Sequence, residues 1–300
     1  MIYINDISII FISVILEAFP MIMLGIVVSS IVEEFVTDEM MVKIIPKNHA
    51  LGAIVGVIMG LFIPTCDCAV IPITKRLIKK KVPLNVAITF MLSSPIINPV
   101  VLFATNYSFN QVMPKMTIYR AIVGVIIAII IGIIMSLTTD SNQILKENDN
   151  ECMHCEHVHK RRGKKVGVIK HIDNILKYCK EEFWEVSKYL IIGAIIASIT
   201  QVVLPKTIIY RYINNKVIST IILMLFAYLI SLCSTSDSFV AKTFVGSFSN
   251  NSILAFLLLG PMIDIKNTIV LAGNFNKRFV TKLIFLIFIF VFIAAMCVSI

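Results

Sequence analysis

Residues 60–99 read GLFIPTCDCAVIPITKRLIKKKVPLNVAITFMLSSPIINP, and residues 228–267 read YLISLCSTSDSFVAKTFVGSFSNNSILAFLLLGPMIDIKN. Both stretches run from an apolar segment to a Cys beside polar residues, then through a helical stretch to an apolar run that we expect to be broken at a Pro. A polar side chain follows that Pro by three residues, Asn98 in the first stretch and Asp264 in the second. Polar breaks at matching places in two apolar segments are typical of transporter substrate sites. The two stretches therefore predict a membrane permease.

The composition is that of a membrane protein. Hydrophobic residues make up 58% of the 300 residues and charged residues only 15%, whereas soluble domains carry about 25% charged residues. Apolar windows long enough to cross the ~30 Å hydrocarbon core recur along the chain. We predict an all-α polytopic integral membrane protein with about eight hydrophobic segments, at 7–32, 50–64, 82–106, 117–137, 186–204, 217–234, 252–275 and 279–299.

The formal net charge of +9 does not indicate nucleic-acid binding, because the basic residues lie in short segments between the predicted spans. Two basic clusters run through 75–81 and 160–165. Lys and Arg between spans usually mark the cytoplasmic face. We therefore expect a multi-pass protein of the inner (plasma) membrane, embedded in the lipid bilayer, with its central hydrophilic segment in the cytoplasm and no nucleic-acid partner.

The two halves also agree outside the quoted stretches. Glu17 precedes Gly25 by eight residues in the first half, and Glu185 precedes Gly193 by eight in the second. Several such features in the same order indicate an internal duplication with broken or re-entrant helices in each copy. The broken segments of the two copies are expected to meet at one central site.

A hydrophilic segment separates these copies. We predict membrane repeat one at 1–137, a hydrophilic linker with a Cys/His-rich tract at 138–182, and membrane repeat two at 183–300. Residues 168–184 mix apolar side chains with lysines. This pattern predicts an amphipathic helix that lies on the membrane surface before the fifth span.

Three cysteines adjoin charged or hydroxyl residues at the breaks. Cys66 and Cys68 flank Asp67, and Cys233 precedes Ser234. If the halves pack about a pseudo-two-fold axis, the three sulfur atoms converge near the middle of the membrane. Thiolates favour soft ions and metalloids such as trivalent arsenic, although free Cys is also tolerated as a small apolar residue. We predict that these three thiols bind a small thiophilic substrate.

Other polar side chains complete the predicted site. Ionisable groups within spans usually serve transport or proton relay. Asp264 could instead form a structural ion pair with Lys266 or Lys242, and Glu17 could be protonated and hydrogen-bonded to a neighbour. We predict further substrate-binding roles for Ser94, Asn98, Ser234, Asp237 and Asp264, and proton coupling through Glu17, Asp67, Asp237 and Asp264.

The tract CMHCEHVH at 152–159 forms a separate group of metal-binding side chains. Cys and His are soft and borderline ligands, and the C-x-x-C spacing favours zinc. No apolar core surrounds the tract, so a structural zinc site is only weakly supported. The tract is either an inert polar segment or a metal site formed by Cys152, His154, Cys155, His157 and His159.

Four motifs carry a family resemblance, and they occur in the order CDCAVIP (66–72), SSPIINP (93–99), CSTSDSFVA (233–241) and GPMIDIKN (260–267). Together they resemble the predicted permeases that include the organoarsenical efflux permeases. The resemblance implies an inner-membrane permease and, for characterised members, export of trivalent organic arsenicals. The family usually has a small residue within its C-x-C and a Gly after it, where this chain has Asp67 and Ala69. The added carboxylate could change selectivity.

The sequence contains no Walker A, G-x-S-x-G, H-E-x-x-H or dinucleotide-binding motif, so it indicates neither an ATPase nor one of the enzymes that these motifs mark. We expect no enzymatic activity and no cofactor. We predict export of a thiophilic metalloid or organoarsenical by proton-coupled alternating access. The alternatives are a membrane thiol oxidoreductase that uses Cys66 and Cys68, or a metal-sensing membrane protein that acts through 152–159.

Overall fold

The computed structural model describes residues 2–35, 49–63, 65, 67–139, 144, 168–203 and 215–298. Apart from isolated bridge residues at Val245, Phe248 and Phe275, every regular element in these ranges is a helix. The prediction of an all-α polytopic membrane protein is confirmed.

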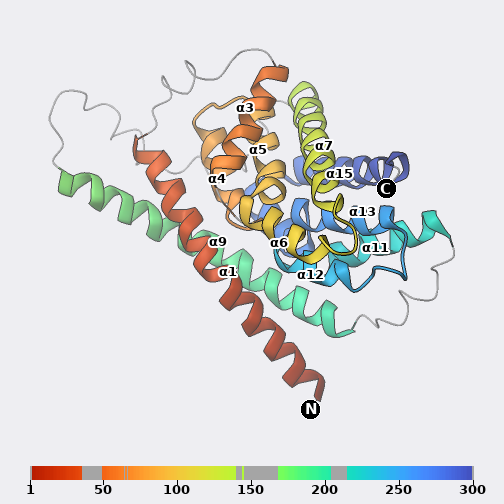
Figure 1. The fold of residues 1–300 in the computed structure, drawn as a ribbon. Coiled ribbons are helices and arrows are strands. Elements are labelled where there is room, and N and C mark those ends of the chain that lie inside the picture. Colours follow the sequence, from red (N-terminus) through yellow and green to blue (C-terminus); the bar gives the residue numbers. More distant parts are fainter. Residues whose placement is uncertain are drawn as a thin grey trace.

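Two long helices lie beside a bundle of shorter ones (Figure 1). The helices α1 (Ile2–Phe35) and α9 (Val168–Val203) cross each other at one side of the molecule and are in contact. The bundle contains α3 (His49–Phe62), α4 (Val70–Lys79), α5 (Leu84–Ile97), α6 (Pro99–Phe109), α7 (Met116–Thr138), α11 (Lys216–Ile230), α12 (Ser236–Lys242), α13 (Asn250–Met262), α14 (Ile265–Asn274) and α15 (Lys277–Cys297).

The helices of the two halves follow the same order of lengths. After the long helices α1 and α9, each half continues with a helix of 14 residues (α3) or 15 residues (α11) and then a short helix of 10 (α4) or 7 (α12). A broken pair and a long helix of 23 (α7) or 21 residues (α15) complete each series. The division into two repeats stays a prediction.

The apolar segments of the structure fall at the predicted spans. Within the described residues, five helical segments are long and apolar enough to cross a membrane. Two of these segments are the broken pairs, α5 with α6 and α13 with α14. Three shorter apolar helices, His49–Phe62, Val186–Val202 and Lys216–Ile230, occupy the other three predicted positions. By contrast, α4 and α12 are only about 15 and 10 Å long and cannot cross a ~30 Å core alone.

The two broken spans end their first helices beyond the prolines and not at them. Pro95 lies inside α5 and Pro261 inside α13. The breaks fall at Asn98 and Asp264, whose side chains accept hydrogen bonds from backbone amides two and three residues later. A capping side chain satisfies amides that the first turn of a new helix leaves unpaired. The polar residue after each Pro therefore sets the position of the break.

The expected surface helix at 168–184 is not separate from the fifth span. Residues 168–203 form one continuous helix of 36 residues, about 54 Å long. The sequence contains no Gly or Pro between 168 and 192 that would end the helix. The prediction of a separate helix before the fifth span is therefore wrong.

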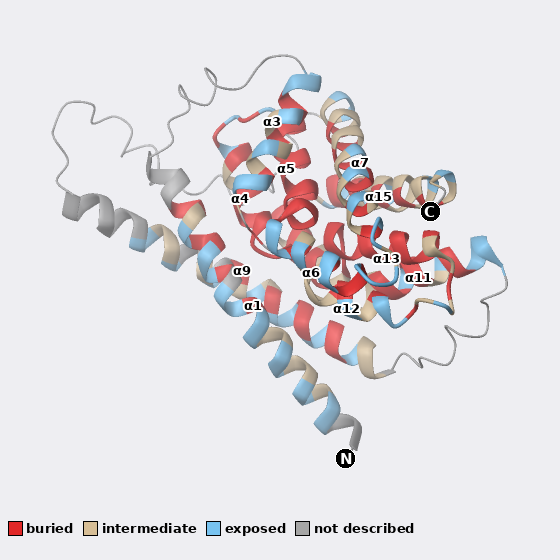
Figure 2. Ribbon diagram, viewed as in Figure 1, coloured by how far each residue is buried: buried red, intermediate tan, exposed pale blue. Residues whose placement is uncertain are grey.

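The centre of the bundle is formed by the first parts of the two broken spans (Figure 2). Every residue of α5 is buried, and so is α13 from Asn251 to Met262. The outer helices α7 and α15 bury one face and expose large apolar side chains such as Ile122 and Phe285 on the other. Such an outer surface suits contact with lipid.

Candidate substrate site

Each short helix is preceded by a loop that carries one of the predicted cysteines. Cys68 lies between α3 and α4, and Cys233 lies between α11 and α12. Ser231 ends α11 in a left-handed conformation, with φ of 54°. A left-handed residue turns the chain sharply after a helix, so the second loop leaves the axis of α11.

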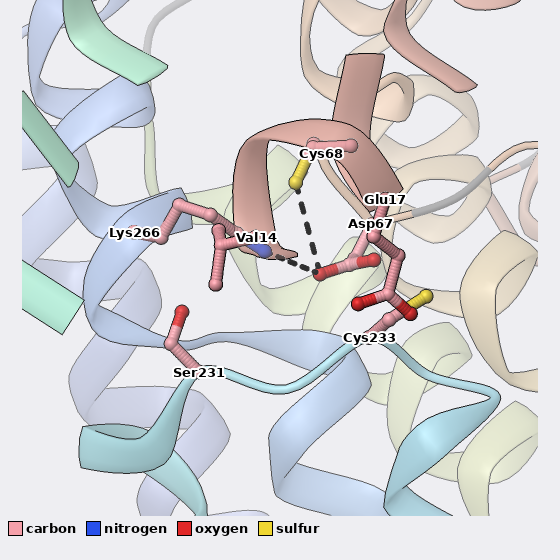
Figure 3. A pocket seen from close by; sticks show the side chains of 8 residues that line it. Val14, Glu17, Asp67, Cys68, Ser231, Cys233 and Lys266 are labelled. Carbon is pink, nitrogen blue, oxygen red and sulfur yellow. Dashed lines mark hydrogen bonds and ion pairs between the residues drawn. The ribbon is translucent and has the colours of Figure 1, made fainter. Parts of the chain in front are cut away.

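A small cavity of about 20 Å³ lies between these two loops, α1 and the start of α14 (Figure 3). A space of this size holds about one water molecule. The residues that line it are Val14, Glu17, Ala18, Asp67, Cys68, Ser231, Cys233 and Lys266. Two predicted thiols and two predicted carboxylates, from segments far apart in the sequence, therefore surround one cavity.

The two described thiols have different surroundings. Cys68 is buried, and its Sγ lies 4.0 Å from Oδ2 of Asp67. Cys233 is partly exposed and shares a hydrogen bond of 3.4 Å with the hydroxyl of Thr235. Neither forms a disulfide among the described residues. Cys66 lies outside the described residues, so the structure places two of the three predicted sulfur atoms.

A cluster of charged groups joins the two halves beside the cavity. Lys266 Nζ lies 3.8 Å from Oδ2 of Asp67 and 3.7 Å from Oδ2 of Asp264. All three side chains are at most 4% exposed. Charges inside a membrane protein are expensive unless they are paired. The ion pairs therefore fasten the loop before α4 to the start of α14.

Asp264 makes two structural contacts, of which the sequence analysis considered only the ion pair. One carboxylate oxygen accepts a hydrogen bond from the backbone amide of Asn267 and so caps α14. The other forms the ion pair with Lys266, one of the two lysines considered for it. Asp264 does not line the cavity. With both carboxylates ionised, Asp67, Asp264 and Lys266 together carry one excess negative charge.

Ser94 and Asn98 lie behind the first loop and do not line the cavity. The hydroxyl groups of Ser94 and Thr65 share a hydrogen bond of 2.8 Å, and the Asn98 amide donates to the backbone carbonyl of Thr65 over 3.4 Å. Both side chains therefore hold the loop that carries Asp67 and Cys68 against α5 and the start of α6.

Asp237 and Ser234 also lie outside the lining of the cavity. Asp237 is 2% exposed, and its Oδ2 has no hydrogen-bond partner among the described residues. Its carboxylate packs against Gly260, where a Cβ atom would lie 2.6 Å from Oδ2. The backbone carbonyl of Ser234 accepts a hydrogen bond of 3.2 Å from Arg120.

Glu17 lies on α1 at the exposed side of the cavity, which we call its outer wall. Its Oε1 accepts a hydrogen bond of 3.1 Å from the hydroxyl of Ser236, at the start of α12. Among the residues that line the cavity, only Glu17 is exposed. The first helix of the chain thus contacts the short helix of the other half.

Ser231 and Arg120 are among the residues of this region that the sequence analysis missed. Ser231 lines the cavity, and a Ser at the end of an apolar run gives no distinctive signal. Arg120 is fully buried beside the second loop. It is the single charged residue within the predicted span 117–137, and this was the signal that could have identified it.

The Cys/His tract at 152–159, with Cys152, His154, Cys155, His157 and His159, lies outside the described residues. Within the part of the chain that is described, no three His, Cys, Asp or Glu side chains form a group that could hold a metal ion. The metal site in the tract stays a prediction.

A family model described as "Predicted permease" matches residues 3–300. The chain is 39% identical over 290 residues to "UPF0718 protein YcgR" of Bacillus subtilis (strain 168), a match that covers 97% of this chain and 96% of the relative. It is 32% identical over 275 residues to a Streptococcus mutans serotype c protein provisionally named as a two-component membrane permease complex subunit, covering 92% and 89%. No solved structure matches.

Proposed function

The chain belongs to the predicted permease family, and from this membership we propose that it exports a thiophilic metalloid or organoarsenical across the inner (plasma) membrane. The observation that supports this substrate class is the cavity that Cys68 and Cys233 both line. Sulfur ligands select soft ions and metalloids. Two thiols from separate loops could bind one such atom, with Cys66 as a third candidate ligand beside Cys68.

Transport by alternating access requires the site to open. A cavity of about 20 Å³ has room for one water molecule and not for an organoarsenical, so one wall has to move. We assign this movement to α1, which contributes Val14, Glu17 and Ala18 to the lining and lies outside the bundle. In this proposal 1–137 and 183–300 are the two repeats that open alternately.

Protons are the proposed coupling ions. The excess negative charge of Asp67, Asp264 and Lys266 lies in a buried, low-dielectric place, where a bound proton would neutralise it. Asp237 supplies another buried carboxylate, with an oxygen that lacks a hydrogen bond. Glu17 is placed at the outer wall, where it could exchange protons with water. Ser94 and Asn98 would support the site by holding its first loop.

The proposal is tested with everted vesicles that contain the full-length chain. A trivalent organoarsenical is offered with and without an imposed proton gradient, and its accumulation is measured. We expect gradient-dependent accumulation that Cys68→Ser and Cys233→Ser each reduce at least about tenfold, because each removes one sulfur ligand. Cys297→Ser is the matched control, since Cys297 is exposed at the end of α15 and does not line the cavity.

The outcomes separate the parts of the proposal. Accumulation that survives both cysteine substitutions would remove the thiol site. Accumulation without a gradient would remove proton coupling. If the inserted wild-type protein accumulates no arsenical, the substrate class is wrong. Free thiols titrated before and after mild oxidation would then test the oxidoreductase alternative.

A further inference from the structure

Arg120 of α7 connects the first half of the chain to the second loop of the site. Its Nη1 donates hydrogen bonds to the hydroxyls of Thr105, at 2.7 Å, and Ser238, at 2.9 Å. Its Nη2 donates to the backbone carbonyl of Ser234 at 3.2 Å. Thr105 belongs to α6, whereas Ser234 and Ser238 lie just before and within α12. One guanidinium thus joins three segments.

The burial of Arg120 is unusual for a charged group. The side chain is 0% exposed, and among the described residues its Nε has no hydrogen-bond partner and no carboxylate lies within ion-pair distance, although the Asp237 carboxylate attracts it electrostatically. A buried charge in a span is expensive and is usually functional. An apolar side chain could fill the same space. What only Arg provides at this position is a planar guanidinium with several N–H donors.

The acceptors of Arg120 flank the functional residues of the second loop. Ser234 directly follows Cys233, and Ser238 directly follows Asp237. No side chain caps the N-terminus of α12, and this helix has only 7 residues. A helix this short has little stability of its own. Its position depends on contacts with neighbours, and Arg120 supplies several of the polar ones.

The other short helix is also fixed by a buried cation. Lys75 of α4 is 5% exposed, and its Nζ donates a hydrogen bond of 3.0 Å to Oδ1 of Asn274 in α14. Each short helix therefore packs against the second part of the opposite broken span, α12 against α6 and α4 against α14. The recurrence of this arrangement indicates that the positions of both short helices are fixed by cross-half hydrogen bonds.

We propose that Arg120 is a positioning residue of the substrate site. By holding the carbonyl of Ser234 and the hydroxyl of Ser238, it sets the positions of Cys233 and Asp237 relative to the first half. The inference deepens the proposed function and rests on it, but the reactivity of Cys233 can be measured without any transported substrate.

The test uses two full-length chains in native membranes, one with Cys233 and one with Cys68 as the sole cysteine. The rate of N-ethylmaleimide labelling is measured in each, alone and with Arg120→Lys or Ser238→Ala. We expect Arg120→Lys to raise the labelling rate of Cys233 about tenfold, because Lys cannot bridge the same acceptors. Ser238→Ala should give a smaller rise. Cys68 labelling should change less than about twofold.

Arg278→Lys is the control substitution, because Arg278 is exposed at the start of α15. An unchanged Cys233 rate in inserted Arg120→Lys and Ser238→Ala protein would overturn the inference. An equal rise at Cys68 and Cys233 would also overturn it, because it would show general loosening. If the wild type transports no arsenical but Cys233 alone responds to Arg120→Lys, the positioning role stands and the substrate proposal fails.

Discussion

The side-chain amide of Asn267 donates a hydrogen bond of 3.0 Å to the carboxylate of Asp67, 200 positions earlier in the chain. Asp67 lies in the loop before α4, and Asn267 lies in the first turn of α14. Together with the ion pair to Lys266, this contact makes the first loop of one half depend on the broken span of the other. We therefore expect a movement at the second break to shift the first loop of the cavity.

Substitution of Asp67 by Asn tests whether transport needs the negative charge of this side chain or only its size. Asp67→Asn keeps the size of the side chain but removes one negative charge beside Lys266. We expect the variant to bind arsenical to its thiols while gradient-dependent accumulation falls at least about tenfold, as measured in everted vesicles. Asp6→Asn, at an exposed position of α1, is the matched control. Undiminished accumulation in Asp67→Asn would exclude Asp67 from coupling.

Removal of Lys266 should destabilise the protein more than removal of either acid. Lys266→Met leaves Asp67 and Asp264 buried without their cation, and breaking a buried pair in this way costs about 3–5 kcal/mol. The melting temperature of the detergent-purified protein should fall accordingly. The double variant Lys266→Met/Asp264→Asn should recover part of the loss, because one uncompensated charge is also removed. Equal melting temperatures for wild type and Lys266→Met would contradict the ion-pair cluster.

The sequence predicted the elements of the site better than the directions of its side chains. The two breaks were predictable because a polar side chain three residues after a Pro inside an apolar segment is costly unless it caps a new helix. Asn98 and Asp264 do so. Cys68 and Cys233, which the sequence places at matching positions of the two loops, line one cavity, and their binding role stays a prediction.

The directions of the side chains could not be predicted, because they depend on packing between segments far apart in the sequence. All residues of α5 are buried, so no apolar stripe in the sequence indicates which face of this helix points toward the cavity. For that reason the sequence alone does not show that the Ser94 hydroxyl bonds to that of Thr65, and the substrate-binding role of Ser94 stays a prediction. Arg120 lies four residues inside its predicted span, where an Arg could equally extend to the membrane surface. Its partner Ser238 is 118 positions away, and no local pattern reports such a contact.

Gly260→Ala should disturb Asp237 directly. The new Cβ would lie 2.6 Å from Oδ2 of Asp237, so the carboxylate has to move, and such overpacking costs about 1–3 kcal/mol. We expect a lower melting temperature and reduced accumulation. Adding Asp237→Ala should restore the melting temperature, because it removes the clashing atoms, but not the accumulation. If the two substitutions lower the melting temperature additively, the carboxylate does not pack against Gly260 as described.

Substitutions of the matched glycines should test whether α1 is the wall that opens. A Cβ on Gly25 would lie 2.5 Å from Cβ of Ala69, next to Cys68, whereas a Cβ on Gly193 of α9 would lie 3.1 Å from Cα of Lys266. Gly25→Ala therefore has to push α1 away from the first loop, while Gly193→Ala requires a shift of only a few tenths of an ångström. We expect Gly25→Ala to raise the rate of maleimide labelling of Cys68 about tenfold, and Gly193→Ala to raise it less. Labelling that responds equally to both glycines, or to neither, would show that α1 does not control access to the cavity.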